Sequence, residues 1–289
     1  MRTPKTPDQA RLQVRELKAA GVDAIKAVLE TGRTGMLFAR MDLAMFHAVI
    51  EESNAQRLPA SVHTGSARDV EDAVDTGAGS IEHGSFSDAI PDAVLARMAK
   101  NAIAYDPTLS VLEAIRDLPA GRGDLLRRSL VQHSVSQKLL SGTAAAIKDG
   151  KFTNTERARG IDEAIRIAHD NLRRAWKAGV TLVTGGGAGN LLVFHGPTVH
   201  RELQLWVEAG RIPFSSTRYR SSRRYLAVSA ARIAVRRFFT PTAAGRPFTI
   251  TDGVVDTFCA RASSRADAAA AATSALSMSA RNRSASRPS

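Results

Sequence analysis

Short apolar segments alternate with helix-forming segments along residues 1–210 of this 289-residue chain, and no other feature restricts the fold as much. The apolar segments are predicted strands that end near Lys26, His63, His83, Tyr105 and Thr184. They lack the polar alternation of a sheet with one solvated face, so they favour parallel strands covered by helices. A closed (β/α)8 barrel needs eight strands, so five indicate either part of a barrel or an open, doubly wound sheet.

Helix signals between the strands support this α/β fold. TPDQARLQVRELKAAG predicts a helix with Thr6 as the N-cap, Pro7 in the first position, Gln9 closing a capping box and Gly21 as the stop. A continuous apolar stripe over residues 161–176 predicts a longer helix that leads into the last strand. The region between the strand ending near Tyr105 and this helix is less regular.

The charge of the chain divides it in two. Residues 211–289 contain 14 Arg, no Lys, 3 Asp and no Glu, and they supply +11 of the net charge of +12. We therefore expect a domain over 1–210 and a disordered Arg/Ser/Ala-rich tail over 211–289. Three interpretations of the tail stay open: an arm that binds nucleic acid, a solvated extension, or the product of a frameshift near codon 210. We do not expect nucleic acid as a partner, because few aromatic residues lie among the arginines and no nucleic-acid motif is present.

Signals for other compartments are missing from the sequence. The one cysteine, Cys259, cannot form an internal disulfide. No apolar run reaches the roughly 18 residues of a membrane span, and the first residues, MRTPKTPDQARLQ, turn polar too soon for a signal peptide. We therefore expect a cytoplasmic protein without a membrane partner.

Three side chains that can carry chemistry lie at predicted strand ends, namely Lys26, His63 and His83. The carboxyl ends of parallel strands build the sites of barrels and of open sheets. Two imidazoles on adjacent strands can converge on one metal ion. A lysine ammonium cannot bind a metal, but carbamylation by CO2 turns the end of its side chain into a carboxylate. Taken singly, each of the three is more often a solvated or hydrogen-bonded residue, whereas their shared position favours a metal site.

Four segments carry a resemblance to a known family: DAIKAVLE, SVHTGSARDVEDAVDTGAGSIEHGS, YDPTLSV and GVTLVTGGGAGNLLVFHGPTVHRELQLWVEAG. They resemble the latter part of the metal-dependent amidohydrolase superfamily, in the branch of imidazolonepropionase and Xaa-Pro dipeptidase. The resemblance covers about residues 8–210 and implies a partial TIM-like (β/α) barrel, about strands 4 to 8. It also implies hydrolysis of a C–N, amide-like bond of a small molecule or dipeptide by metal-activated water. By position, Lys26 resembles the carboxylated lysine that bridges two ions, and His63 and His83 resemble metal ligands, with zinc as the expected divalent ion.

The glycine-rich segment TGGGAGN departs from the family pattern G-T-D-x-G. Gly187 stands where the family has an aspartate that binds metal and serves as the general base. The Gly-Lys-Ser/Thr ending of a phosphate-binding loop is absent, so the segment is a site without its acid rather than a phosphate cradle. The family's His-x-His pair is also missing, as expected of an N-terminally truncated barrel fragment. The resemblance therefore implies that one half of a two-metal site is retained and that catalysis is impaired.

Further expectations concern the substrate and the edges of the sheet. His195, after the glycine-rich segment, could reach a small-molecule substrate at the barrel mouth. Tyr105 and Thr108 lie where the family's seventh strand approaches the substrate, and a structural role suits them equally well. The outer strands of a partial barrel would expose unpaired backbone groups and promote self-association. The alternative to a hydrolase is a protein without activity, either a degenerate paralogue or a binding module with a basic tail.

Overall fold

The computed structural model describes residues 2–33, 36–37, 39–150, 158–190 and 192–210. Its centre is a sheet of five parallel strands, which lie side by side in chain order: β1 (Ile25–Val28), β4 (Ala60–His63), β5 (Ser80–Glu82), β6 (Ala104–Asp106) and β7 (Thr181–Leu182). Two short strands, β2 (Gly32–Arg33) and β3 (Met36–Leu37), form a separate antiparallel pair.

The strand order identifies the sheet as part of a barrel. A doubly wound sheet reverses its order at a switch point, whereas these five strands follow one another without reversal. Within the described residues the sheet is not closed, and β1 and β7 are its edges. The predicted partial barrel of about strands 4 to 8 is therefore confirmed, and the doubly wound alternative is wrong.

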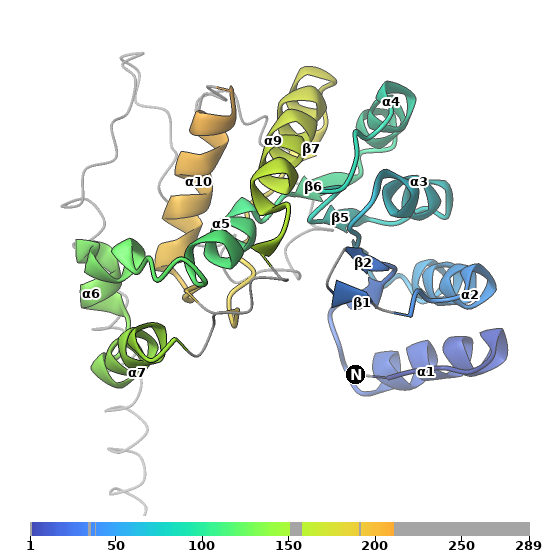
Figure 1. The fold of residues 1–289 in the computed structure, drawn as a ribbon. Coiled ribbons are helices and arrows are strands. Elements are labelled where there is room, and N and C mark those ends of the chain that lie inside the picture. The colour runs from blue at the N-terminus through green and yellow to red at the C-terminus, as the bar shows by residue number, and fades with distance from the viewer. Residues whose placement is uncertain (1, 34–35, 38, 151–157, 191, 211–289) are drawn as a thin grey trace, which may run out of the picture.

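Helices follow most of the strands, and Figure 1 shows α1 to α4 one after another along the same side of the sheet. The helices are α1 (Pro7–Ala19), α2 (Leu43–Ala55), α3 (Ala67–Asp75), α4 (Asp92–Lys100), α5 (Leu109–Asp117), the 3-10 helix η1 (Asp124–Arg127), α6 (Ser129–Ser134), α7 (Gln137–Lys148), α9 (Ile161–Lys177) and α10 (Pro197–Gly210). In the described part of the less regular region, the chain forms the helices α5, η1, α6 and α7. Their short lengths give weak apolar periodicity, which hid them.

The predicted start of α1 is confirmed in most details. Thr6 accepts a hydrogen bond from the Gln9 backbone N–H at 3.2 Å, and Pro7 is the first helical residue. The Gln9 side chain returns a bond to the backbone N–H of Lys5 at 2.6 Å, one residue earlier than a regular capping box would place it. The predicted longer helix is α9, which buries Ile161, Ala164, Ala168 and Leu172 of the predicted stripe and partly buries Ile165 and Trp176.

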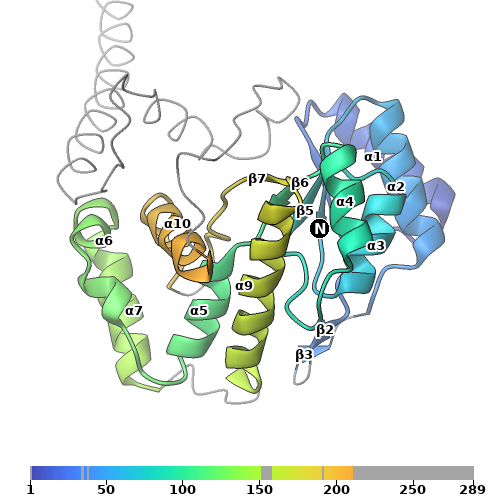
Figure 2. The ribbon, with the colours of Figure 1, turned by 90° about the horizontal axis from the view of Figure 1, so that it is seen from above.

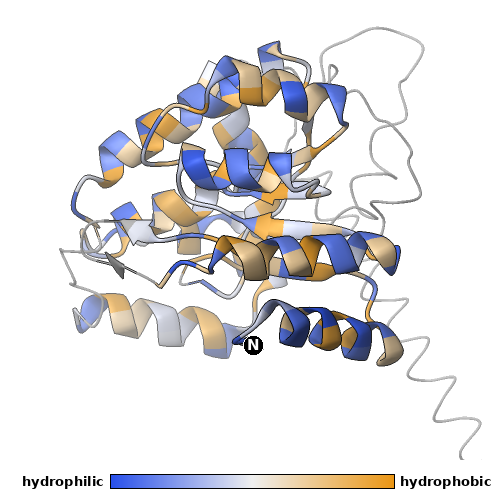
Figure 3. Ribbon diagram, turned by 90° about the vertical axis from the view of Figure 1, so that its right-hand side faces the viewer, coloured by the Kyte–Doolittle hydropathy of each residue, from blue (hydrophilic) through white to orange (hydrophobic). Residues whose placement is uncertain are grey.

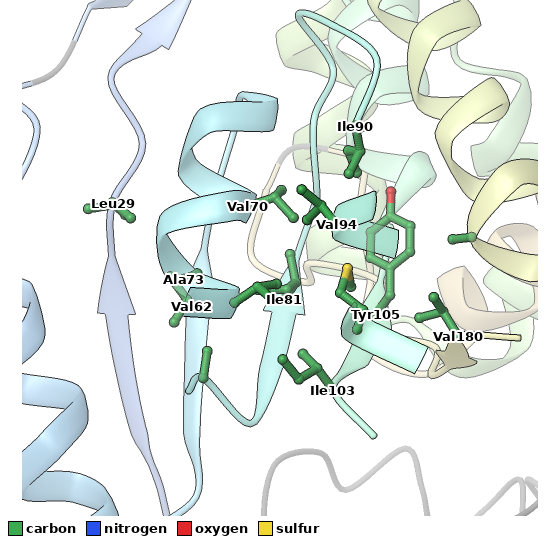
Figure 4. Close-up of a cluster of buried hydrophobic side chains, with 14 of the residues drawn as sticks. Leu29, Val62, Val70, Ala73, Ile81, Ile90, Val94, Ile103, Tyr105 and Val180 are labelled. Carbon is green, nitrogen blue, oxygen red and sulfur yellow. The ribbon is translucent and has the colours of Figure 1, made fainter. Parts of the chain in front are cut away.

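The two faces of the sheet differ in polarity because successive side chains along a strand point to opposite sides. Toward the helices, Val62, Ile81 and Tyr105 are fully buried. Figure 4 shows Val70 of α3 and Val94 of α4 beside them. In Figure 3 the covering helices carry hydrophilic and hydrophobic residues side by side, as expected of helices with one covered face. The opposite face of the sheet carries the polar residues Lys26, Ser61, His63, Ser80, Glu82 and Asp106.

A second, smaller apolar cluster lies beyond the sheet. Figure 2 shows α5, α6, α7 and α10 grouped on the side away from α1 to α4. The residues buried in this cluster come from α5, η1, α6 and α7 and from the segment that precedes α10: Ala114, Leu126, Val131, Leu140, Leu192, Val193 and Phe194. In the part of the chain that the structure describes, no helix is long and apolar enough to cross a membrane. The expected tail over 211–289 lies outside the described residues.

Candidate functional site

Two histidines meet at the carboxyl end of the sheet. His63 is the last residue of β4, and His83 follows directly after its neighbour β5. Nε2 of His83 lies 2.9 Å from Nδ1 of His63, and the two rings stand edge to face with centroids 4.2 Å apart. His83 has a left-handed backbone with φ of +70°, which a residue with a Cβ rarely adopts. The predicted convergence of these two side chains is therefore a feature of the structure.

The outer nitrogen of each ring has its own partner. Nε2 of His63 contacts the carboxylate of Glu30, which follows β1, and Nδ1 of His83 contacts the hydroxyl of Thr108, which precedes α5. Both partners are buried, Glu30 with 7% and Thr108 with 3% of its surface exposed. Four segments of the chain thus form one hydrogen-bonded row, Glu30–His63–His83–Thr108.

An ionised carboxylate can only accept, so Glu30 sets the direction of the first bond, and with neutral imidazole rings the other two bonds follow from it. His63 therefore donates from Nε2 to Glu30, which leaves its Nδ1 as an acceptor. That nitrogen accepts from Nε2–H of His83, so Nδ1 of His83 in turn accepts from the hydroxyl of Thr108. This assignment requires both rings to be neutral.

The surroundings of His83 favour the neutral ring. Burial lowers the pKa of His83 well below its ordinary value; a protonated His63 would lower it further, and so does the charge of Lys26. A neutral imidazole is the form that binds metal ions.

Lys26 lies on the same face of the sheet but not where the sequence indicated. The predicted strand end near Lys26 is wrong, because β1 continues to Val28. In the sheet register Val28 pairs with His63, whereas Lys26 pairs with Ser61, two residues nearer the strand's amino end. Lys26 is exposed; its charge adds to the lowering of the His83 pKa and opposes the rise of the Asp106 pKa that burial causes. Its side chain can therefore reach the histidine row only by extending along the sheet.

Two carboxylates lie on the same polar face of the sheet, at the ends of the neighbouring strands β5 and β6. Glu82 and Asp106 are paired in the register of β5 and β6. Glu82 accepts a bond from the Ser61 hydroxyl at 2.5 Å, and Asp106 accepts one from the Gly185 backbone N–H at 2.9 Å. Burial raises the pKa of Asp106 well above its ordinary value, and the charges of Glu82 and Glu202 act in the same direction.

The glycine-rich segment runs beside these residues without a carboxylate of its own. Gly187 has a φ of +61°, and a Cβ added there would lie 2.5 Å from Cγ2 of Val111 in α5. A Cβ at Gly185 would collide with the Asp106 carboxylate. Gly187 is therefore favoured by its backbone and by the space that Val111 occupies, whereas Gly185 is favoured only by the space that Asp106 occupies.

The histidine row fits part of a metal centre. Nitrogens of His63 and His83 converge, and a carboxylate and a hydroxyl hold the far side of each ring, as outer partners of metal-binding histidines do. Zinc sites use three or four protein ligands. Within the described ranges no group of three or more His, Cys, Asp or Glu side chains could hold a metal ion.

His195 is not brought to this row in the structure. It is exposed, and it follows Val193 and Phe194, which belong to the second apolar cluster. Tyr105 is fully buried among the helices, with its ring directed away from the polar face. Of the expected substrate-side residues, only Thr108 contacts an imidazole ring, whereas the Tyr105 hydroxyl donates to the backbone carbonyl of His83 at 3.4 Å. Sequence reasoning missed Glu30, although its place two residues after β1 was a signal of the same kind as the histidines.

Comparisons with known proteins match the fold at low sequence identity. No family model matches the sequence, and no curated protein matches it. Among solved structures, an amidohydrolase is 18% identical with a TM-score of 0.51, and the match covers 72% of this chain and 43% of that one. A Xaa-Pro dipeptidase with methionine bound in its active site is 21% identical with a TM-score of 0.50, over 72% and 44% of the two chains. An ochratoxinase from A. niger is 22% identical with a TM-score of 0.50, over 72% and 39%.

The chain therefore matches less than half the length of these solved structures. At such identities the likeness concerns the fold, and it agrees with the parallel sheet in barrel order. The described residues thus have the fold of part of an amidohydrolase, which confirms at the level of the fold the resemblance that the sequence motifs indicated.

Proposed function

We propose that this chain carries the half of an amidohydrolase site that binds one divalent metal ion, with Lys26, His63 and His83 as its ligands. The observation that carries the proposal is the pair of histidines at the ends of β4 and β5, each held from behind by a buried partner. Lys26 supplies the third ligand after reaction of its amine with CO2. Its exposure leaves the amine open to that reaction. Zinc is the proposed ion, because imidazole and carboxylate oxygen are among its usual ligands.

A divalent ion in such a site makes bound water more acidic and polarises the carbonyl of a substrate. The residues of the chain orient the ligands. Glu30 keeps the proton of His63 on Nε2, so Nδ1 faces the site with a free lone pair. For His83 to present Nε2 in the same way, its proton must sit on Nδ1. The Thr108 hydroxyl suits both forms of His83, since it can accept as well as donate.

The proposed reaction class is hydrolysis of a C–N bond of the amide kind in a small molecule. The oxygen of water joins the carbonyl carbon, the C–N bond breaks, and the leaving nitrogen takes up a proton. A positioned carboxylate would normally carry that proton, and Gly187 has none. General acid–base catalysis contributes about 10²–10⁴-fold, so we propose that turnover by this chain is impaired. The packing of Val111 against Gly187 favours the alternative of a protein that binds without hydrolysis.

Metal titration of the full chain tests the proposal. Competition with a chromophoric chelator, in the presence of bicarbonate, should give one Zn²⁺ per chain. His63→Ala and His83→Ala should each remove most of this binding, and Lys26→Ala should weaken it and abolish its dependence on bicarbonate. The matched control is His47→Ala, which removes an exposed histidine of α2. Equal affinity in the wild type and in both site variants would overturn the proposal.

A hydrolysis assay tests impairment separately. The metal-loaded chain is offered a panel of dipeptides and N-acyl amino acids, and release of the amine is followed. We expect rates close to the uncatalysed background. Efficient turnover that disappears in His63→Ala would show that another group carries the proton, and impairment would be rejected.

A further inference from the structure

The amino end of α5 is built without its own cap. Thr108 occupies the N-cap position, where a threonine hydroxyl ordinarily accepts a bond from a backbone N–H of the first turn. Here Thr108 has a left-handed backbone, with φ of 48° and ψ of 44°, and its side chain makes no capping bond. Its hydroxyl is engaged by Nδ1 of His83 instead. The N–H groups at the start of α5 therefore need another acceptor.

Glu202 of α10 is that acceptor. Its carboxylate accepts bonds from the backbone N–H groups of Leu109 and Ser110, both at 2.8 Å, and from Nε1–H of Trp206 at 3.0 Å. The side chain is fully buried. A negative charge at a helix amino end is stabilised by the helix dipole, and charge-assisted bonds of this kind are among the stronger hydrogen bonds.

Burial of the Glu202 carboxylate is unfavourable for its charged form, and the pKa of Glu202 reflects this. Burial raises the pKa of Glu202, while the bonds from Ser110, Leu109 and Trp206 act against the rise. A buried carboxylate without these donors would be strongly unfavourable. Glu202 is thus held in place by the same bonds through which it caps α5.

We propose that Glu202 is a positioning residue for the histidine pair, because it caps α5 in place of Thr108 and leaves the Thr108 hydroxyl free to hold His83. Without Glu202, the hydroxyl of Thr108, which occupies the N-cap position, becomes a substitute acceptor for the helix N–H groups. Thr108 would then turn toward α5, and Nδ1 of His83 would lose its partner. The part of this inference that concerns metal affinity rests on the proposed function, whereas the part that concerns the ring of His83 does not.

If Glu202 had only a structural role, a different result would be expected. A carboxylate that only joined α10 to α5 would change the stability of the fold when removed but would leave the proton of His83 where it is. The readout is therefore the tautomer of His83 in the metal-free full chain, measured by two-bond ¹H–¹⁵N correlation. From the bond directions of the row, the wild type should hold a single His83 tautomer with the proton on Nε2.

The variants separate the two roles. In Glu202→Gln an amide NH2 faces one of the helix N–H donors, so we expect a mixture of His83 tautomers. Thr108→Val should give the same mixture, and Thr108→Ser should restore the wild-type spectrum. The double variant Glu202→Gln with Thr108→Val should match Thr108→Val alone, because Glu202 acts through Thr108. Trp206→Phe is the control, since it removes one donor to Glu202 but keeps both bonds to α5.

Zn²⁺ affinity gives a second readout on the same proteins. Loss of an outer partner of a metal ligand typically weakens metal binding by about 10–100-fold. We expect a loss of this size in Glu202→Gln and in Thr108→Val, with no further loss in the double variant. If no variant, including the wild type, binds Zn²⁺, the proposed function fails while the tautomer measurement still decides the role of Glu202.

A folded Glu202→Gln protein with the wild-type His83 tautomer would overturn the inference, as would additive losses of affinity in the double variant. If Glu202→Gln does not fold, Glu202→Asp replaces it. The aspartate keeps the charge but is one methylene shorter, so the expected change in the tautomer is in the same direction and smaller. A folded Glu202→Asp protein with an unchanged tautomer would equally overturn the inference.

Discussion

Gly187→Asp would return a carboxylate to the glycine-rich segment, and we expect it to destabilise the fold rather than to restore activity. Gly187 lies in the left-handed region with φ of +61°, and a Cβ there would come within 2.5 Å of Cγ2 of Val111. The left-handed backbone costs a residue with a Cβ roughly 1–2 kcal/mol. Forcing an extra group into a packed site costs about 1–3 kcal/mol.

The two contributions together give about 2–5 kcal/mol for Gly187→Ala and a similar value for Gly187→Asp. A typical domain is stable by only roughly 5–15 kcal/mol, so the loss is easily measured by urea unfolding followed by circular dichroism. Gly121→Ala is the matched control, because Gly121 has a φ of +67° and nothing within 4 Å of its added Cβ. It should show the backbone contribution alone.

Val111→Ala provides the second half of the experiment. Combined with Gly187→Asp it should recover the steric part, so the double variant should be more stable than the sum of the single effects by about 1–3 kcal/mol. The reasoning is refuted if Gly187→Asp is no less stable than Gly121→Ala, or if Val111→Ala and Gly187→Asp are simply additive.

Three further predictions concern other parts of the structure. Gly65→Ala places a Cβ 2.7 Å from Cγ of Glu30, so it should displace Glu30 from His63, destabilise the fold by about 1–3 kcal/mol in urea unfolding and weaken Zn²⁺ binding. Asp106→Asn should stabilise the chain at neutral pH. Because the pKa of Asp106 is raised in the folded state, the folded chain keeps a proton that the unfolded chain loses above about pH 4. The stability of the wild type therefore falls as the pH rises through the folded-state pKa. The advantage of Asp106→Asn over the wild type should vanish below about pH 4, and thermal melting at several pH values would contradict this if the advantage were constant. Among the described residues β1 and β7 have no outer partner strand, and we expect these edges to make the full chain self-associate; a concentration-independent monomer in size-exclusion chromatography would contradict that expectation.

The sequence predicted the order of the strands better than their ends. Alternation of apolar strands with helices depends on burial, which leaves a strong signal along the chain. The end of β1 was missed because Lys26 interrupts its apolar run, and a charged side chain usually marks the end of a buried strand. In the structure Lys26 stays within β1, because the polar face of this edge strand is exposed to solvent.

The site was predictable only where its residues follow strand ends. His63 and His83 stand in that position, so their convergence could be expected. Their partners Glu30 and Thr108 become neighbours only through the packing of other segments. The start of α5 was hidden for a related reason, because its capping carboxylate, Glu202, comes from a helix far along the chain and Thr108 lacks the usual capping geometry.

Anomalous diffraction from a crystal of the full chain with Zn²⁺, recorded at the zinc absorption edge, tests the central claim most directly. We expect one strong peak between Nδ1 of His63 and Nε2 of His83, about 2.0–2.1 Å from each nitrogen, with density for a carboxylated Lys26 beside it. The absence of a peak at this place, with the two imidazoles still bonded to each other in saturating Zn²⁺, would contradict the claim.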